Sequence, residues 1–292
     1  MPASFEAFFL PSTAAVGGQR FCLYHPAQGT RPRGLVLYIH PFAEEMNKAR
    51  RMAALQSRAL AQAGFAVLQM DLNGCGDSSG DFCDATWQGW VDDVLQGCHW
   101  LRERHRFGAA QGATGQNDRS DLPLWLWGLR AGCLLAADAA RQLHEPCNFL
   151  FWQPPTAGKL LLQQFLRLKV AGDLIGGQAK GVMQVLRQQL ANGSSVEIAG
   201  YLMAPGLAAG LEQATLAPPS PSTQAQRVEW FELTTREDAS LSPASGQAIG
   251  QWQQVGFQTS SHIVQGPAFW QTTEMEDAPA LIAATTVAVS RD

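Results

Sequence analysis

Short apolar runs alternate with longer stretches of helical periodicity through much of the chain. Residues 34–40, 65–71 and 124–127 are nearly continuous apolar runs, the pattern of strands buried on both faces. Between them, 47–63 and 85–104 carry apolar residues at helical spacing. Strands that alternate with helices predict an α/β fold, with a mostly parallel sheet covered by helices on both faces.

Further patterns complete this sheet at both ends of the chain. Two β-type runs, 5–10 and 19–25, flank Gly17-Gly18 and predict an antiparallel hairpin at a sheet edge. The glycine-rich stretch 108–121 is predicted as a loop, and the proline-rich stretch 217–226 as a linker. The other predicted elements are helices at 131–143 and 243–255, strands at 147–153, 227–234 and 259–264, and a closing helix or strand at 278–289.

The alternation stops between residues 156 and 217. This segment is apolar, short of charge and helical in pattern, with no convincing strand pair. Its helical stretches are 160–170, 182–190 and 198–211. The sequence therefore predicts a core made of 1–155 and 218–292 and a helical cap made of 156–217. The cap either simply packs on the core or also covers an elongated apolar ligand such as an acyl chain.

Composition excludes several classes of protein. Charged residues are 16% of the chain, the net charge is −4 and no basic block occurs, which argues against nucleic-acid binding. The first ten residues contain Glu6 and lack the layout of a signal peptide, and no apolar run predicts a membrane span. The six scattered cysteines are read as reduced core thiols. We therefore expect a cytoplasmic protein, without a transmembrane segment, metal or cofactor.

The most informative motif follows the strand at 124–127. That strand runs into Gly128-Leu-Arg-Ala-Gly132 and then into an alanine-rich helix, which is the layout of a nucleophile elbow, Gly-x-Ser-x-Gly. The two glycines suit a sharp turn, and Arg130 occupies the position of the serine. A guanidinium is always protonated and only donates hydrogen bonds, so it can neither attack a carbonyl nor accept a proton.

The order of these motifs resembles an α/β-hydrolase with a helical cap. Two stretches, His40-Pro-Phe-Ala-Glu-Glu-Met-Asn-Lys48 and Asp71-Leu-Asn-Gly-Cys-Gly-Asp-Ser-Ser-Gly-Asp81, are similar to those of the exosortase-system-associated hydrolases of the second clade, found in bacterial exopolysaccharide and protein-sorting gene clusters. The resemblance implies an ester or thioester hydrolase, or an acyl transferase. It also leaves open a homo-oligomer or a partner from the same gene cluster.

The catalytic triad that the resemblance implies is incomplete. Its acid would follow the strand at 227–234, where Glu237 and Asp238 are suitably placed. Its histidine would follow the last strand, within 265–271, which contains none. His262 lies earlier, inside the strand, and would become the base only if the alignment of that strand slipped. A conventional Ser-His-Asp mechanism is therefore not expected.

Other parts of the hydrolase site remain available. The oxyanion hole would use the backbone N–H groups of Ala131 and Phe42, because Pro41 has no N–H to donate. Such a pocket at a helix N-terminus also binds carboxylate or phosphate without any chemistry. Cys75 is a candidate thiol nucleophile with His40 as its base, although we favour a buried cysteine and a structural histidine.

Arg130 is expected to have a carboxylate partner, because a buried arginine without one would be costly. Glu44 and Glu45 lie on the loop before the helix at 47–63, where they either suit the helix dipole or line the site. Glu44 is then a candidate catalytic carboxylate, and Glu45 a candidate ligand-binding one. Asp71 and Asp77 are alternative partners, and a bound anion is another.

Two functions therefore remain open at this point. The first is an acyl hydrolase or transferase with a non-standard site. The second is an inactive member of the fold that binds an anionic or acylated small molecule, or a partner protein, through the same cleft. A hydrogen bond between Cys75 and His40 would favour the enzyme, and Arg130 held by carboxylates would favour binding.

Overall fold

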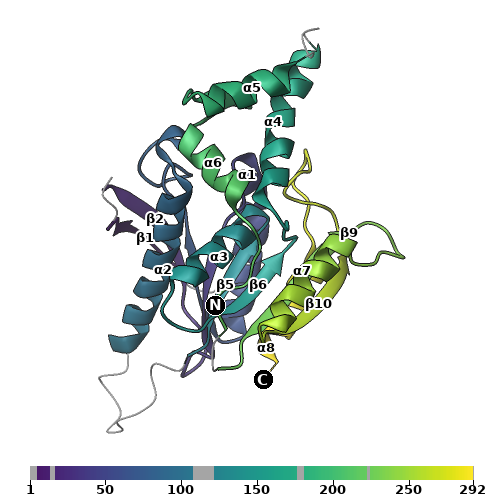
Figure 1. The fold of residues 1–292 in the computed structure, drawn as a ribbon. Helices are drawn as coiled ribbons and strands as arrows, with labels where there is room; N and C mark the ends of the chain where they lie inside the picture. The colour runs from purple at the N-terminus through teal and green to yellow at the C-terminus, as the bar shows by residue number, and fades with distance from the viewer. Residues whose placement is uncertain (1–4, 14–16, 108–121, 176–180, 222–223, 292) are drawn as a thin grey trace.

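The computed structural model describes residues 5–13, 17–107, 122–175, 181–221 and 224–291 (Figure 1). The main strands are β1 (Glu6–Pro11), β2 (Gln19–His25), β3 (Gly34–Ile39), β4 (Phe65–Met70), β5 (Leu124–Leu129), β6 (Asn148–Trp152), β9 (Arg227–Thr234) and β10 (Gln258–Gln265). Within the described residues they form one sheet in the order β1-β2-β4-β3-β5-β6-β9-β10. The strands from β4 to β10 in that order run parallel, and the β1–β2 hairpin forms an antiparallel edge.

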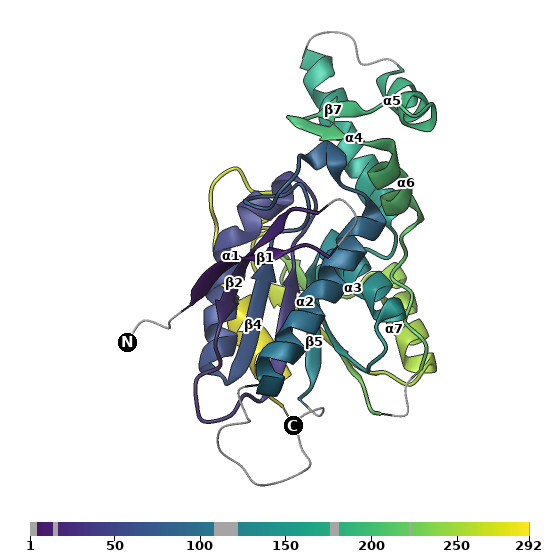
Figure 2. The ribbon, with the colours of Figure 1, turned by 90° about the vertical axis from the view of Figure 1, so that its left-hand side faces the viewer.

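Helices cover both faces of this sheet. They are α1 (Glu44–Gln62) and α8 (Pro279–Ser290) on one face, and α2 (Trp87–Phe107), α3 (Ala131–Gln142) and α7 (Pro243–Gln254) on the other. Figure 2 shows the sheet between α1 on the left and α2, α3 and α7 on the right. All six residues of β3 and all six residues of β5 are buried, as a sheet covered on both faces requires. The predicted fold class is confirmed.

The segment between β6 and β9 lies above the sheet in Figure 1. It contains α4 (Gly158–Ile175), α5 (Val182–Ala191) and α6 (Pro205–Gln213), and the short hairpin of β7 (Val196–Ile198) and β8 (Tyr201–Met203). The predicted helix at 198–211 is therefore wrong over its first residues. Ala199 and Gly200 both have positive φ angles, 50° and 83°, which suit a tight hairpin turn, and Pro205 begins the helix that follows.

Other predicted elements differ from the structure by a few residues at their ends. The closing segment is helical, and α1 begins at Glu44 rather than at residue 47. The predicted loop 108–121 lies outside the described residues. The six cysteines form no disulfide, and all but Cys83 are buried. Among the helices that the structure describes, none combines the length and hydropathy that a membrane span needs.

Candidate functional site

The turn between β5 and α3 has the backbone geometry of a nucleophile elbow. Arg130 has φ 54° and ψ −116°, a conformation that residues other than glycine rarely adopt. Its N–H donates to the carbonyl of Trp152 at 3.0 Å, and its own carbonyl accepts from Cys133 N–H at 3.0 Å. The surrounding structure therefore holds residue 130 at the tip of a strained turn.

The two glycines of the motif are required by close packing. A Cβ atom on Gly128 would lie 2.4 Å from the backbone nitrogen of Cys133. A Cβ atom on Gly132 would lie 2.1 Å from the carbonyl oxygen of Ile39. Both distances are well below van der Waals contact. The second contact also presses the start of α3 against the end of β3.

This close approach brings together the two predicted oxyanion-hole segments. Ala131 is the first residue of α3, where backbone N–H groups have no partner within the helix. Phe42 lies on the loop after β3, before Ala43, which has φ 51°. The Phe42 ring is buried and packs edge-on against Phe165 of α4, with ring centroids 5.1 Å apart. The elbow therefore keeps a backbone N–H donor at the N-terminus of α3, next to the loop that carries Phe42.

The side chain of Arg130 points toward α4 and is 11% exposed. Its Nε donates to Oε1 of Glu45 at 3.2 Å, and its Nη2 donates to Oε1 of Gln164 at 2.8 Å. The guanidinium carbon lies 5.9 Å from the centre of the Trp270 ring, within range of a cation–π contact. Burial raises the pKa of Glu45, and the charge of Arg130 opposes that shift. A hydrogen bond with the side chain of Gln271 also opposes the rise in pKa, because it favours the charged form of Glu45.

The carboxylates considered as alternatives have other roles. Oδ2 of Asp71 accepts from Nη2 of Arg50 at 2.9 Å and from the backbone N–H of Asp77 at 3.1 Å. Glu44 is half exposed and pairs with Lys48 at 3.3 Å along α1. Glu45 is therefore the predicted candidate that contacts Arg130.

A cavity of about 460 Å³ opens beside these groups, between the core and α4. The residues that line it are Phe42, Glu44, Glu45, Lys48, Leu161, Gln164, Phe165, Leu168, Trp270 and Gln271. They combine an apolar wall with a few polar groups, as is usual in small-molecule sites. Glu45, Gln164 and Trp270, the partners of Arg130, all belong to this lining. Arg130 itself is not among the lining residues, so the cavity lies beside the elbow and meets it through these three partners.

His40 and Cys75 do not form a catalytic pair in this structure. Nε2 of His40 accepts from Leu72 N–H at 3.2 Å, so Nδ1 carries the proton and donates to the carbonyl of Pro41 at 2.8 Å. Burial lowers the pKa of His40, which favours this neutral form. Burial raises the pKa of the Cys75 thiol, which also favours its neutral form. Among the described residues, no hydrogen bond joins Cys75 to His40. His40 anchors the loop, and Cys75 is a protonated core thiol.

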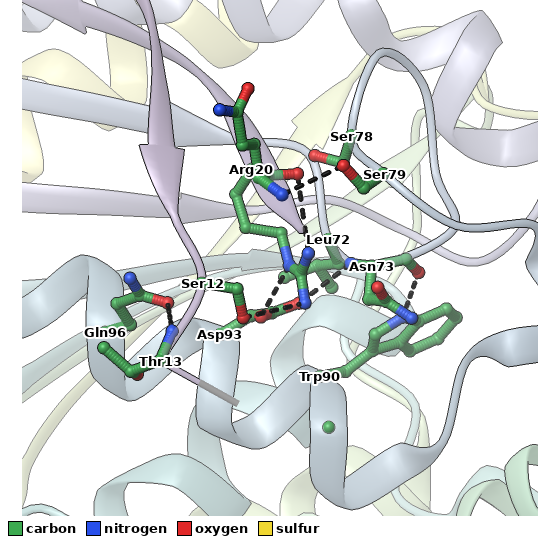
Figure 3. Close-up of polar contacts among 12 residues, drawn as sticks. Ser12, Thr13, Arg20, Leu72, Asn73, Ser78, Ser79, Trp90, Asp93 and Gln96 are labelled. Atoms are coloured by element: carbon green, nitrogen blue, oxygen red, sulfur yellow. Dashed lines mark hydrogen bonds and ion pairs between the residues drawn. The ribbon is translucent and has the colours of Figure 1, made fainter. Parts of the chain in front are cut away.

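A buried ion pair fixes the loop that carries Cys75 (Figure 3). Nε of Arg20 in β2 donates to Oδ1 of Asp93 in α2 at 2.7 Å, and Oδ2 of Asp93 accepts from Asn73 N–H at 2.8 Å. Nε1 of Trp90 donates to the carbonyl of Asn73 at 2.9 Å. Ser78 is buried in the same loop, so its role is structural. These residues hold the loop in place and are not part of the lining of the cavity.

The candidate acid and the candidate base of the catalytic triad do not come together in the described residues. Asp238 is exposed on the loop after β9, and no described hydrogen bond joins it to a histidine. His262 lies opposite Phe231 within β10, which continues to Gln265, so the alignment has not slipped. Its Nε2 contacts Oε2 of the buried Glu229 at 2.8 Å. Trp270 instead occupies the segment after β10 where the base was sought.

Sequence reasoning missed Gln164 and Trp270. Gln164 lies on α4, and its helical pattern gave no reason to single out one polar residue. Trp270 belongs to the stretch 265–271, in which the hydrolase pattern points to a histidine and gives no role to an aromatic residue. An arginine at the elbow was the available signal, since it requires acceptors and favours an aromatic face.

Two sequence comparisons match part of the chain. The family model of the X-Pro dipeptidyl-peptidases (S15 family) matches residues 20–122, which end before the elbow. The human protein ABHD12B is 28% identical over 124 residues, which are 42% of this chain and 29% of the human protein. The chain thus spans under a third of that relative's length. The family-model match does not include Arg130.

Solved structures match nearly the whole chain. Est1E from Butyrivibrio proteoclasticus, bound to ferulic acid, is 14% identical with a TM-score of 0.65, over 97% of this chain and 98% of that one. A carboxyl esterase from Bacillus coagulans is 12% identical with a TM-score of 0.59, over 98% and 97%. Monoglyceride lipase from Saccharomyces cerevisiae is 12% identical with a TM-score of 0.56, over 99% and 93%. The sheet order, the strained elbow and these likenesses together show that the chain has the α/β-hydrolase fold.

Proposed function

We propose that this protein binds an acylated or anionic small molecule in the cleft beside Arg130, without forming a covalent acyl-enzyme. The observation that carries the proposal is the guanidinium at the tip of the elbow, held by Glu45 and Gln164. A group that only donates hydrogen bonds can bind a carbonyl or carboxylate oxygen but cannot attack one.

The lining of the cleft supports the same proposal. Phe42, Leu161, Phe165 and Leu168 provide apolar surface for a chain, and Glu45 and Gln164, which both bond to Arg130, provide polar groups. The first N–H groups of α3 add fixed donors beside Arg130, and the helix dipole favours negative charge there. An acyl carbonyl or carboxylate facing Arg130, with its chain along α4, satisfies both parts of the cleft.

Hydrolysis of an ester or thioester is the second candidate, and the retained backbone frame favours it. The elbow and the oxyanion loop keep positive φ angles at Arg130 and Ala43. Two structural neighbours are described as a carboxyl esterase and a monoglyceride lipase. The reaction would require water as nucleophile and a base other than histidine, for which Glu45 is the nearest candidate.

Paired binding and turnover measurements separate the two functions. Purified protein is tested with short and long p-nitrophenyl esters and acyl-CoA thioesters, and binding of non-hydrolysable acyl compounds is measured by calorimetry. We expect binding without turnover, with affinity reduced in Arg130→Ala and unchanged in Cys75→Ser. Turnover by the wild-type protein that disappears in Cys75→Ser would establish a thiol enzyme and overturn the proposal.

We also propose the narrower relationship to exosortase-associated proteins, on the strength of the motifs at 40–48 and 71–81. It places the ligand or partner among the products of exopolysaccharide and protein-sorting gene clusters. A cytoplasmic location belongs to the same proposal. Co-purification of the tagged protein from cell fractions tests both.

A further inference from the structure

The charged groups around the cleft balance one another. Arg130 faces Glu45 at 3.2 Å, and Lys48 faces Glu44 at 3.3 Å. Two cations and two carboxylates therefore lie in or beside the lining of the cleft. A ligand entering there meets a donor-rich guanidinium whose charge already has a partner.

Glu45 is the more consequential of the two carboxylates. Its side chain is 20% exposed, whereas that of Glu44 is 49% exposed and lies nearer to water. Both Glu45 and Arg130 lie in a poorly hydrated corner, where charges interact more strongly than at the surface. A ligand group that bonds to the Arg130 guanidinium comes within a few ångströms of Glu45, because Glu45 is bonded to the same group, so the charge of the ligand matters.

The two residues together favour a particular ligand head group. A free carboxylate gains the attraction of Arg130 but meets repulsion from Glu45. A carboxamide presents a carbonyl oxygen to Arg130 and N–H donors to Glu45, and brings no charge. Each cleft residue then faces a complementary partner, and neither side chain has to give up its ion pair.

We propose that Glu45 is the specificity-determining residue of the cleft and makes it select acyl amides over free fatty acids. This inference rests on the proposed function, since it concerns the ligand of the same site. It assigns Arg130 to the acyl carbonyl, Glu45 to the amide N–H and the apolar wall along α4 to the chain.

The test compares three probes with the same acyl chain: decanamide, decanoate and methyl decanoate. Calorimetry at neutral pH is expected to show decanamide binding about tenfold or more tightly than decanoate, as like-charge repulsion in a partly buried site predicts. Methyl decanoate, which has no N–H, is expected to lie between them. Equal or tighter binding of decanoate by the wild-type protein would overturn the inference.

A substitution identifies the residue responsible. In Glu45→Gln, decanoate is expected to gain about tenfold in affinity, because the repelling charge is gone while an acceptor for Arg130 remains. Glu45→Ser provides a second charge-removing variant, and melting curves establish that each variant is folded. Glu212→Gln on α6 is the matched control, since Glu212 pairs with Arg187 away from the cleft. An unchanged ratio of decanamide to decanoate affinity in both Glu45 variants would refute the role of Glu45.

The failure of the inference is distinguishable from that of the proposed function. If none of the three probes binds at concentrations where the protein is folded, the proposed acyl-binding function fails. If the probes bind with the opposite preference, that function stands and the role of Glu45 falls.

Discussion

Nη2 of Arg130 donates a hydrogen bond of 2.8 Å to Oε1 of Gln164, so the tip of the elbow is joined to the cap helix α4. Nearby, Nδ2 of Asn47 in α1 donates to the hydroxyl of Tyr201 in β8 at 3.2 Å. The residue at the usual position of a nucleophile therefore helps to hold the segment between β6 and β9 against the sheet and its helices.

Removing this link is expected to loosen the cap. Gln164→Ala deletes the acceptor of Arg130, so the free energy of unfolding should fall by about 1 kcal/mol, the net value of a partly exposed hydrogen bond to a charged group. Hydrogen exchange should accelerate in α4 more than in the sheet. Gln163→Ala makes the same change at the adjacent position and serves as control; equal acceleration in both variants would contradict the assignment.

Restoring a serine at the elbow is not expected to restore hydrolysis. Arg130→Ser supplies a hydroxyl, but the segment after β10 presents Trp270 instead of a base, and both nitrogens of His40 are engaged. A serine without a base is a poor nucleophile. We expect no burst with p-nitrophenyl acetate and no adduct with a fluorophosphonate by mass spectrometry. Rapid labelling of the introduced serine would show that a base has been overlooked.

The raised pKa of Glu45 predicts a pH-dependent effect on stability. The folded protein holds the Glu45 proton to higher pH than the unfolded chain does, so the contribution of Glu45 to stability falls as pH rises from its ordinary pKa of 4.5 toward the raised value. The Glu45→Gln variant does not lose stability in this way, because glutamine does not titrate. Urea titrations across that window should therefore show Glu45→Gln gaining stability relative to wild type as pH increases. A constant or narrowing difference would contradict the shift.

The packing around the elbow predicts that one added methyl group greatly lowers the free energy of unfolding. Gly132→Ala places a Cβ atom 2.1 Å from the backbone carbonyl of Ile39, which has no room to move. We expect a loss of several kcal/mol, of about the size caused by overpacking of a core, or failure to fold. Gly246→Ala in α7 meets no atom within 4 Å and should raise the melting temperature, because alanine favours helix by about 1 kcal/mol.

The buried ion pair in Figure 3 predicts a further large effect. Both side chains of the Arg20–Asp93 pair are at most 2% exposed, so Asp93→Asn leaves an uncompensated charge in the interior. The free energy of unfolding should fall by about 3–5 kcal/mol in chemical denaturation. Glu6→Gln breaks the exposed pair with Arg104 and should cost less than about 1 kcal/mol. Similar losses in the two variants would contradict the importance of burial.

Much of the fold was predictable because its strands are buried on both faces. Runs such as 34–40 and 65–71 are apolar along their length, and their alternation with helical patterns indicates parallel connections. The β7–β8 hairpin was missed for a physical reason. Strands of three residues are too short to show a period of two, so the turn at Ala199-Gly200 carried the only signal.

The site was predictable only in part. The elbow glycines and the replacement of serine by Arg130 are visible in the sequence. The choice of Glu45 over Asp71 depends on which loop faces the guanidinium, and Arg50 engages Asp71 first. Gln164 and Trp270 reach Arg130 through packing of the cap and of the segment after β10, which no local pattern encodes.

The strained backbone at residue 130 is maintained by its neighbours and not by its own side chain. The bonds from Trp152 and Cys133 and the packing of Gly128 and Gly132 all act on main-chain atoms. The backbone conformation of the elbow is therefore separable from the chemistry of the side chain that it presents. The same turn can present a donor such as arginine or a nucleophile such as serine, and the neighbours of the side chain then decide what that group does.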